Sequence, residues 1–193
     1  MVVRVEPSIE WTPGARAVLT AASELFYARG LHAVGVEAIA ERAGVTKKTL
    51  YDRFGSKERL VVEYLADRDR RWRDLLADRL GAAGPGAAEQ VAALFDASRE
   101  WALVEGSRGC AMVNALAEVG DGAHPAHAVI VGHKRWMLAL LREVAGRTPA
   151  PDPDALAQTL LLLHEGALVS HGTGVVDDAF GRARTAALAL LPR

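Results

Sequence analysis

The sequence predicts an all-α protein, and three observations lead to this prediction. No stretch sustains the alternation of apolar and polar residues that is typical of a half-buried strand. Apolar residues instead recur at helical spacing from end to end of the chain. Residues that start helices (Ser, Thr and Asp) and residues that end them (Gly and Pro) separate these apolar stripes.

The first predicted helix has good signals at both ends. Thr12 and Pro13 suit the N-cap and the first helical position, and Gly30 suits the stop. Between them Val18, Ala22, Leu25, Phe26 and Arg29 follow helical spacing.

A pair of short helices and then a long one are expected next. The short helices cover 36–43 and the residues from Thr46 to Phe54, and Ser56 caps a long helix of about 35 Å. The stretch from Gly81 to Gly86 ends that helix. Beyond it, the spacing predicts helices at 87–105, 110–119, 125–145, 153–171 and 176–191.

Composition narrows the function class. The 193 residues are 50% hydrophobic and carry 23 basic and 24 acidic side chains, so any anion-binding surface must be local. The single cysteine cannot form an intrachain disulfide, and no secretion signal is recognisable, so we expect a cytoplasmic protein. The longest apolar run, near 160–163, is far shorter than the roughly 20 residues of a membrane span, and no membrane association is expected.

The stretch IAERAGVTKKTLYDRF, residues 39–54, has the pattern of a helix-turn-helix. Ala40 is small where two helices cross, Gly44 tolerates the left-handed turn conformation, and Leu50 and Phe54 can fill the space between the helices. In such a motif the N-terminal residues of the second helix face base edges and phosphates in the major groove. Thr46 to Thr49 occupy these positions here.

Charge agrees with this placement. From 44 to 59 there are five basic and two acidic residues, a local surplus of three positive charges. A charge cluster alone is more often a solubilising helix face. Its coincidence with the Ala, Gly and apolar pattern favours DNA binding.

These residues resemble a known family. Residues 13–60, with a first helix ending in Phe26, Ala28, Arg29 and Gly30 and followed by IAERAGVTKKTLYDRFGSKERL, are similar to the DNA-binding domain of the TetR family of bacterial transcriptional regulators. The resemblance implies an N-terminal three-helix DNA-binding domain, residues 1–56, and a C-terminal helical domain for ligand binding and dimerisation, residues 57–193. It also implies a homodimer on a palindromic operator of double-stranded DNA, and an unidentified small-molecule effector that changes the spacing of the heads.

The resemblance assigns roles residue by residue. Lys47, Lys48 and Thr49 match positions that meet bases or nearby phosphates, while Tyr51 and Lys57 match phosphate contacts. Val34 and Gly35 depart from the usual Thr or Ser before the second helix, which removes one hydroxyl cap, and Arg53 replaces the more usual His or Tyr. The predicted DNA-binding residues are Thr46, Lys47, Lys48, Thr49, Tyr51, Arg53 and Lys57.

Polar and aromatic side chains within the later apolar helices are candidates for a ligand pocket, although ordinary core is the alternative for each of them. Asn114 and Glu118 lie one turn apart and share a helix face. The candidates are Trp101, Cys110, Met112, Asn114, Glu118, His133, Trp136, Met137 and His164.

Other chemistry is less well supported. A metal site is suggested by three histidines, His124, His127 and His133. No Cys or carboxylate completes a recognised ligand spacing with them, so we predict neither metal nor cofactor. Cys110 is either a sensor thiol or a small buried residue. No GxSxG turn or phosphate-binding glycine loop indicates an enzyme.

The last two helices, rich in Leu and Ala, fit either an internal core or a four-helix dimer interface, and the resemblance favours dimerisation through them. The sequence therefore predicts a ligand-responsive DNA-binding repressor. An activator or architectural DNA binder with the same head remains open, and a helical small-molecule binder or enzyme without DNA function is the alternative of another class.

Overall fold

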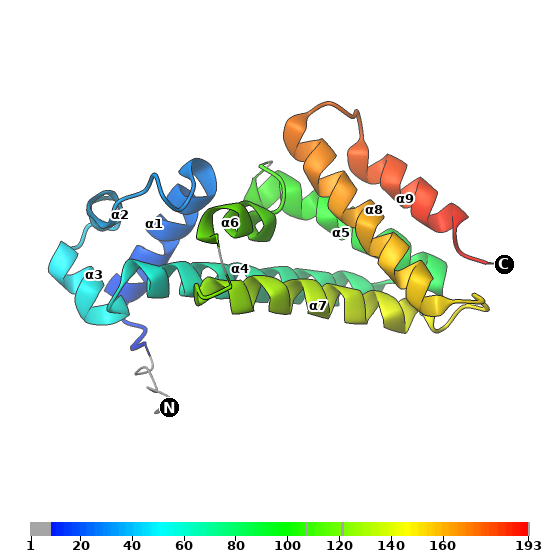
Figure 1. Cartoon of the computed structure of the whole chain (residues 1–193), viewed down its shortest axis with the longest axis horizontal. Coiled ribbons are helices and arrows are strands. Elements are labelled where there is room, and N and C mark those ends of the chain that lie inside the picture. The colour runs from blue at the N-terminus through cyan, green and yellow to red at the C-terminus, as the bar shows by residue number, and fades with distance from the viewer. Residues whose placement is uncertain (1–8, 107, 121, 193) are drawn as a thin grey trace.

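The computed structural model describes residues 9–106, 108–120 and 122–192 (Figure 1). All the regular elements in these ranges are helices, which confirms the predicted fold class. The helices are α1 (Pro13–Arg29), α2 (Val36–Arg42), α3 (Lys47–Phe54), α4 (Lys57–Ala82), α5 (Ala87–Glu105), α6 (Ala111–Val119), α7 (Ala126–Ala145), α8 (Pro153–Thr173) and α9 (Ala179–Ala189).

The predicted caps are confirmed. Thr12 Oγ1 accepts a hydrogen bond from the Ala15 N–H at 3.2 Å, and Ser56 Oγ accepts one from the Arg59 N–H at 3.0 Å. These contacts satisfy amide groups in the first turn that have no partner within the helix. Gly30 ends α1 with a φ of +91°.

The last helix is shorter than the predicted 176–191. Asp178 has a left-handed φ of +49°, and its Oδ1 accepts a hydrogen bond from the Gly181 N–H at 3.3 Å. An Asp tolerates this conformation because its short side chain bonds locally. The start of α9 therefore moves to Ala179, and α8 extends to Thr173, two residues beyond its predicted end.

The helices form a small head and a longer body (Figure 1). α1, α2 and α3 make the head, and α4 runs from the head along the whole body, where it packs against α5 and α7. α8 packs against α7 and α9, and α9 also packs against α5. α6 lies between the two parts, across the top of α4 in the view of Figure 1.

Two clusters of buried side chains hold these parts together. One joins the head to the first half of α4 and continues into α6 and α7 through Met112, Ala115 and Ile130. The other fills the body between α4, α5, α7, α8 and α9. Since the first cluster includes Leu60 and Leu65, the core of the head extends beyond residue 56. The division between 56 and 57 stays a prediction.

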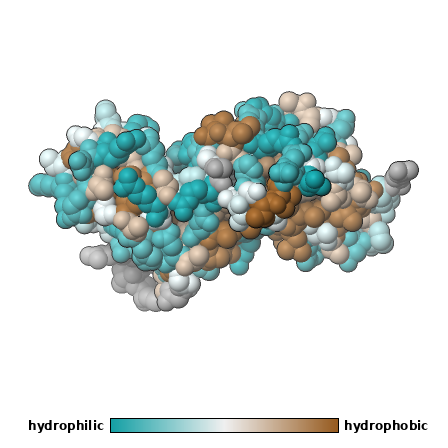
Figure 2. Space-filling view, turned by 90° about the horizontal axis from the view of Figure 1, so that it is seen from above, coloured by the Kyte–Doolittle hydropathy of each residue, from teal (hydrophilic) through white to brown (hydrophobic). Residues whose placement is uncertain are grey.

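Hydrophobic side chains are also exposed on the body. Leu162 and Val169 of α8 are 71% and 53% exposed, although each is apolar. In the face shown in Figure 2 the head end is mostly hydrophilic and the hydrophobic surface lies over the body. Among the residues that the structure describes, no helix combines the length and the apolar character needed to cross a membrane.

Candidate DNA-binding surface and ligand cavity

The turn between α2 and α3 has the geometry of a helix-turn-helix. Gly44 adopts a left-handed φ of +66°, and the Val45 N–H donates to the Ala40 carbonyl oxygen at 3.0 Å. Leu50 and Phe54 are 0% and 3% exposed. Their burial fixes one side of α3 against the head, so its other side faces solvent.

The N-terminal end of α3 carries five of the predicted DNA-binding residues. Thr46 is the N-cap and accepts from the Thr49 N–H at 3.1 Å, and the two hydroxyl oxygens lie 2.9 Å apart. Lys47 and Lys48 are exposed, and Tyr51 is 40% exposed. The structure brings these side chains together where the helix end itself favours a phosphate.

Both lysines hold a carboxylate in the absence of DNA. Lys47 pairs with Glu37 of α2, and Lys48 Nζ lies 2.6 Å from Asp52 Oδ2. The hydrogen bond from Lys47 lowers the pKa of Glu37. Exposed pairs of this kind contribute at most about 1 kcal/mol, so a phosphate can displace the carboxylates.

Arg53 and Lys57 are placed differently. The Arg53 guanidinium is directed to Glu10, in the segment before α1. Lys57 is the first residue of α4 and is half-buried. Gly35 is the N-cap of α2 and makes no side-chain hydrogen bond. The hydroxyl cap that a Thr or Ser would supply is therefore absent, as the sequence predicts.

A first set of contacts fastens the end of α1 to the loop between α5 and α6. The Tyr27 hydroxyl donates to the Gly106 carbonyl oxygen at 2.8 Å and accepts from the Arg108 N–H at 2.8 Å. The Arg108 guanidinium in turn donates to the Ala28 carbonyl oxygen. Gly106 has a φ of +103°, and a Cβ there would lie 2.4 Å from the Tyr27 ring. Only glycine allows this close approach.

A second set fastens the residues after α1 to α6. The Glu118 carboxylate accepts from the Leu31 N–H at 2.9 Å and from the His32 N–H at 2.8 Å. The His32 ring nitrogen Nε2 lies 2.7 Å from the Glu118 carbonyl oxygen. We call the contacts of Tyr27 and Glu118 together the clasp. The clasp ties the head to both ends of the segment 106–118.

A small cavity lies inside the body next to the clasp. It encloses about 50 Å³ between α4, α5, α7, α8 and the start of α6. Two tryptophans of its wall, Trp72 and Trp101, meet edge to face at 5.6 Å between ring centroids. Five of the predicted pocket residues line it, namely Trp101, Cys110, Met112, His133 and His164.

His164 gives this cavity a buried polar side chain. The Ser98 hydroxyl donates to the Leu94 carbonyl oxygen at 2.8 Å, and its oxygen lies 2.9 Å from His164 Nε2. Burial lowers the pKa of His164 against the opposing effect of Glu165, so the ring is neutral at neutral pH. Nδ1 is buried without a hydrogen-bond partner in the described residues, and Glu165 Oε1 lies 3.7 Å from it. A ligand group that forms a hydrogen bond with this nitrogen could satisfy it.

A half-buried ion pair lies beside the cavity. Lys134 Nζ lies 2.7 Å from both oxygens of Glu165 and 3.2 Å from Cys110 Sγ. Burial would lower the pKa of Lys134, but Cys110 and Glu165 outweigh it and raise that pKa. Burial would likewise raise the pKa of Glu165, but His164 and Lys134 lower it to about 2. Both groups are therefore charged at neutral pH.

The structure places four of the predicted pocket residues elsewhere. Asn114 donates to the Arg108 carbonyl oxygen at 2.9 Å, and Glu118 belongs to the clasp. Trp136 lies on the outer side of α7 under the Arg73 guanidinium, 4.2 Å from the ring centroid. Met137 is fully buried, and its Sδ accepts from Trp72 Nε1 at 3.4 Å.

Sequence reasoning missed seven residues that line the cavity, and Arg68, Trp72 and Ser98 are among them. Arg68 and Trp72 do follow the apolar stripe of α4, and a charged residue on a buried stripe was a usable signal. Arg68 is 6% exposed, and its guanidinium lies 4.3 Å from the Tyr27 ring centroid. Ser98 carried no such signal.

The histidines do not gather around a metal position. His133 Nδ1 lies 2.7 Å from Asp69 Oδ1, while the His124 ring nitrogen Nδ1 accepts from the Ala126 N–H at 3.1 Å. In residues 9–106, 108–120 and 122–192, no group of three or more His, Cys, Asp or Glu side chains is arranged to hold a metal ion.

Comparisons with known proteins agree with this geometry. Residues 18–64 match the family model described as bacterial regulatory proteins, tetR family. A solved TetR-family transcriptional regulator from Streptomyces coelicolor is 31% identical, with 94% of this chain and 97% of that chain covered and a TM-score of 0.86. The chain belongs to the TetR family. A TetR transcriptional regulator from Streptomyces avermitilis is 30% identical over 92% of this chain and 98% of its own, with a TM-score of 0.70.

Membership of the TetR family confirms the predicted class of function, a DNA-binding transcriptional regulator rather than an enzyme. TetR-family regulators act as dimers with small-molecule effectors. A curated relative, the transcriptional activator FasR from Mycolicibacterium smegmatis, is 52% identical over 48 residues. The match covers 25% of this chain and spans only 22% of that protein.

Proposed function

We propose that the chain is a ligand-responsive repressor that binds a palindromic operator as a homodimer and is released by a small molecule. The observation that carries the proposal is the clasp, which connects the head to the segment 106–118. Gly109, Cys110, Ala111 and Met112 of that segment also line the cavity. A conformational change at the cavity can therefore reach the head through this one segment.

The proposed DNA contacts are Thr46, Lys47, Lys48, Thr49 and Tyr51 at the exposed end of α3, with Lys57 beside them at the start of α4. Arg53 contributes once its pair with Glu10 opens. In a dimer two such heads, about 34 Å apart, read successive major grooves on one side of the duplex. The dimer interface is α8 and α9, because Leu162 and Val169 of α8 and Leu190 at the end of α9 are exposed apolar side chains that favour burial against a second copy.

The size of the cavity suggests how release works. About 50 Å³ is far below the 300–1,000 Å³ of a typical small-molecule site, so an effector must bind a state with a wider cavity. A ligand shifts an equilibrium only by its differential affinity for the two states. The wider state displaces the segment 106–118, and the clasp carries this displacement to α1. The head then leaves the position that fits the operator.

DNA binding tests the head. We expect the protein to bind DNA from upstream of its own gene with a strong salt dependence in fluorescence-anisotropy titrations. Lys48→Ala should weaken binding by about 1–3 kcal/mol if it contacts a base, and Lys57→Ala should reduce the salt slope by about one. Arg135→Ala is the control, because Arg135 is an exposed cation on α7, away from the head. Binding that is insensitive to salt, or equal in all three variants, would contradict the assignment.

Activation is the second candidate, and the similarity of the head to FasR favours it. The same head can serve either outcome, because contact with DNA does not fix the effect on transcription. A reporter fused to the bound promoter separates the two: deletion of the regulator raises expression under a repressor and lowers it under an activator.

A further inference from the structure

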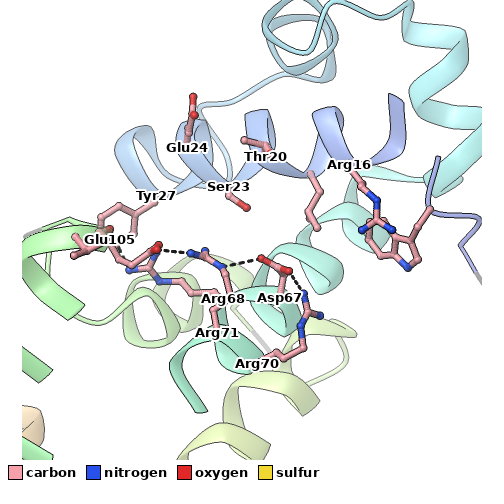
Figure 3. Close-up of a pocket in the computed structure, with 13 residues that line it drawn as sticks. Arg16, Thr20, Ser23, Glu24, Tyr27, Asp67, Arg68, Arg70, Arg71 and Glu105 are labelled. Atoms are coloured by element: carbon pink, nitrogen blue, oxygen red, sulfur yellow. Dashed lines mark hydrogen bonds and ion pairs between the residues drawn. The ribbon is translucent and has the colours of Figure 1, made fainter. Parts of the chain in front are cut away.

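A second and larger cavity lies outside the body, between the head and α4. It is a cleft of about 730 Å³, within the range of small-molecule sites. α1 forms one wall, and α4 with the end of α5 forms the other; Figure 3 shows Ser23 and Tyr27 projecting from α1 toward this second wall. Its lining shares only Arg68 with the interior cavity.

The wall made by α4 and α5 is a chain of alternating charges (Figure 3). Arg70 and Arg71 both pair with Asp67, and Arg71 also pairs with Glu105. Arg68 Nη1 lies 3.3 Å from the same Glu105. This wall therefore holds three guanidinium groups against two carboxylates.

The α1 wall adds further positive charge. Arg16 faces the cleft and has no acidic partner among the residues that the structure describes. Glu24 is the carboxylate of this wall, and it is already held at 2.7 Å by Arg42, which lies outside the cleft. With that partner included, five arginines face three carboxylates, a surplus of two positive charges.

Apolar surface lies beside these charges. Trp11 is 38% exposed and Val104 is 76% exposed, and both line the cleft together with the half-buried Leu19. The rings of Trp11 and Phe54 pack edge to face with their centroids 6.2 Å apart, and this contact holds Trp11 in place beside the cleft. The cleft thus combines unneutralised guanidinium groups with exposed apolar side chains.

We propose that this cleft binds a small anionic amphiphile, a molecule that joins one sulfonate, carboxylate or phosphate group to an aromatic or aliphatic body. Arg16 and Arg70 hold the anionic group from the two walls, since Arg16 has no acidic partner in the described part of the chain and the side chain of Arg70 is 64% exposed. The apolar body lies against Trp11 and Leu19, at the Arg16 end of the cleft. This site is separate from the interior cavity and does not depend on it.

Two fluorescent probes of nearly equal shape test the proposal. The anionic probe is 1-anilinonaphthalene-8-sulfonate, and the neutral probe is N-phenyl-1-naphthylamine, which lacks the sulfonate. Both are titrated into the full chain and into the double variant Arg16→Gln, Arg70→Gln. We expect the double variant to bind the sulfonate at least about tenfold more weakly, as loss of charged hydrogen bonds implies, and to bind the neutral probe as the wild type does.

Controls separate this result from a general effect of charge or folding. Arg135→Gln makes the same change at an exposed arginine of α7 and should leave both probes unaffected. Ser98→Ala, in the wall of the interior cavity, should also leave the sulfonate affinity unchanged. The proposal is overturned if the wild type does not prefer the sulfonate to the neutral probe. It is also overturned if the double variant keeps wild-type affinity for the sulfonate, or if it loses both probes equally.

Discussion

Removal of one oxygen atom from the clasp should loosen the head. Tyr27→Phe deletes the hydroxyl that donates to the Gly106 carbonyl oxygen and accepts from the Arg108 N–H, both at 2.8 Å. The aromatic ring stays, and with it the contact with the Arg68 guanidinium at 4.3 Å. The variant therefore isolates the hydrogen bonds from the packing.

The expected cost follows from those two hydrogen bonds. Each is worth about 0.5–1.5 kcal/mol net, and water can reach part of this site, so we expect a loss of about 1–2 kcal/mol in the free energy of unfolding. For a chain of this length that corresponds to a decrease of about 2–8 °C in Tm. Burial raises the pKa of Tyr27, against the opposing effect of Arg68, so the hydroxyl keeps its proton at neutral pH and can donate.

Urea unfolding monitored by circular dichroism measures this loss, and Tyr51→Phe is the matched control. Tyr51 loses the same atom, but its hydroxyl makes no hydrogen bond within the described part of the chain. We expect Tyr51→Phe to weaken DNA binding at unchanged stability. Tyr27→Phe should lower stability and reduce the response of DNA binding to an effector. A Tyr27→Phe protein within about 0.3 kcal/mol of the wild type would refute the role given to the clasp.

Two further predictions concern the body. Leu162→Glu and Val169→Glu should each convert the dimer to a monomer in analytical ultracentrifugation, because a charge then replaces apolar surface in the proposed α8–α9 interface. The control is Leu103→Glu, which changes an apolar side chain of α5 that is 77% exposed and should leave the dimer intact. Stability should also depend on pH through Glu165, whose pKa of about 2 lies below the ordinary 4.5. A lowered pKa stabilises the fold above the ordinary value, and this contribution is lost as the pH falls from 4.5 toward 2. Glu165→Gln should be less stable than the wild type at neutral pH because it leaves Lys134 without its ionic partner. Between pH 4.5 and 2, the free energy of unfolding of the variant, measured in urea, should fall less steeply than that of the wild type. The two slopes should differ by up to about 1.4 kcal/mol per pH unit. Equal slopes for the two proteins would contradict this account.

Signals from residues close together in the sequence were sufficient to predict the structure of the head. Thr12 and Ser56 cap helices in the structure as the sequence predicts, because a cap depends on residues only three positions away. Gly44 and the buried pair Leu50 and Phe54 likewise define the turn and the inner side of α3. The outer side, with Lys47, Lys48 and Tyr51, then follows from helical periodicity.

The ligand cavity could be predicted only in part. Five of nine candidate side chains reach it, but periodicity shows only that a helix face is buried and does not show which helix lies opposite. Asn114 and Glu118 share a helix face as expected, yet both are bound to the loop and the head instead of the cavity. Arg68 is a charged residue on the apolar stripe of α4, which indicates an unusual position, but the stripe does not show that aromatic rings surround its guanidinium.

The all-α fold, the helix-turn-helix and the basic end of α3 could be predicted from the sequence, because each depends on contacts within a few turns of chain. Two other features could be seen only in the folded chain: Glu118 binds the amide of Leu31, 87 positions away, and an arginine-rich cleft lies between the head and α4. Such contacts depend on how packed helices cross and rotate. That arrangement is fixed by the whole core, and no local segment encodes it.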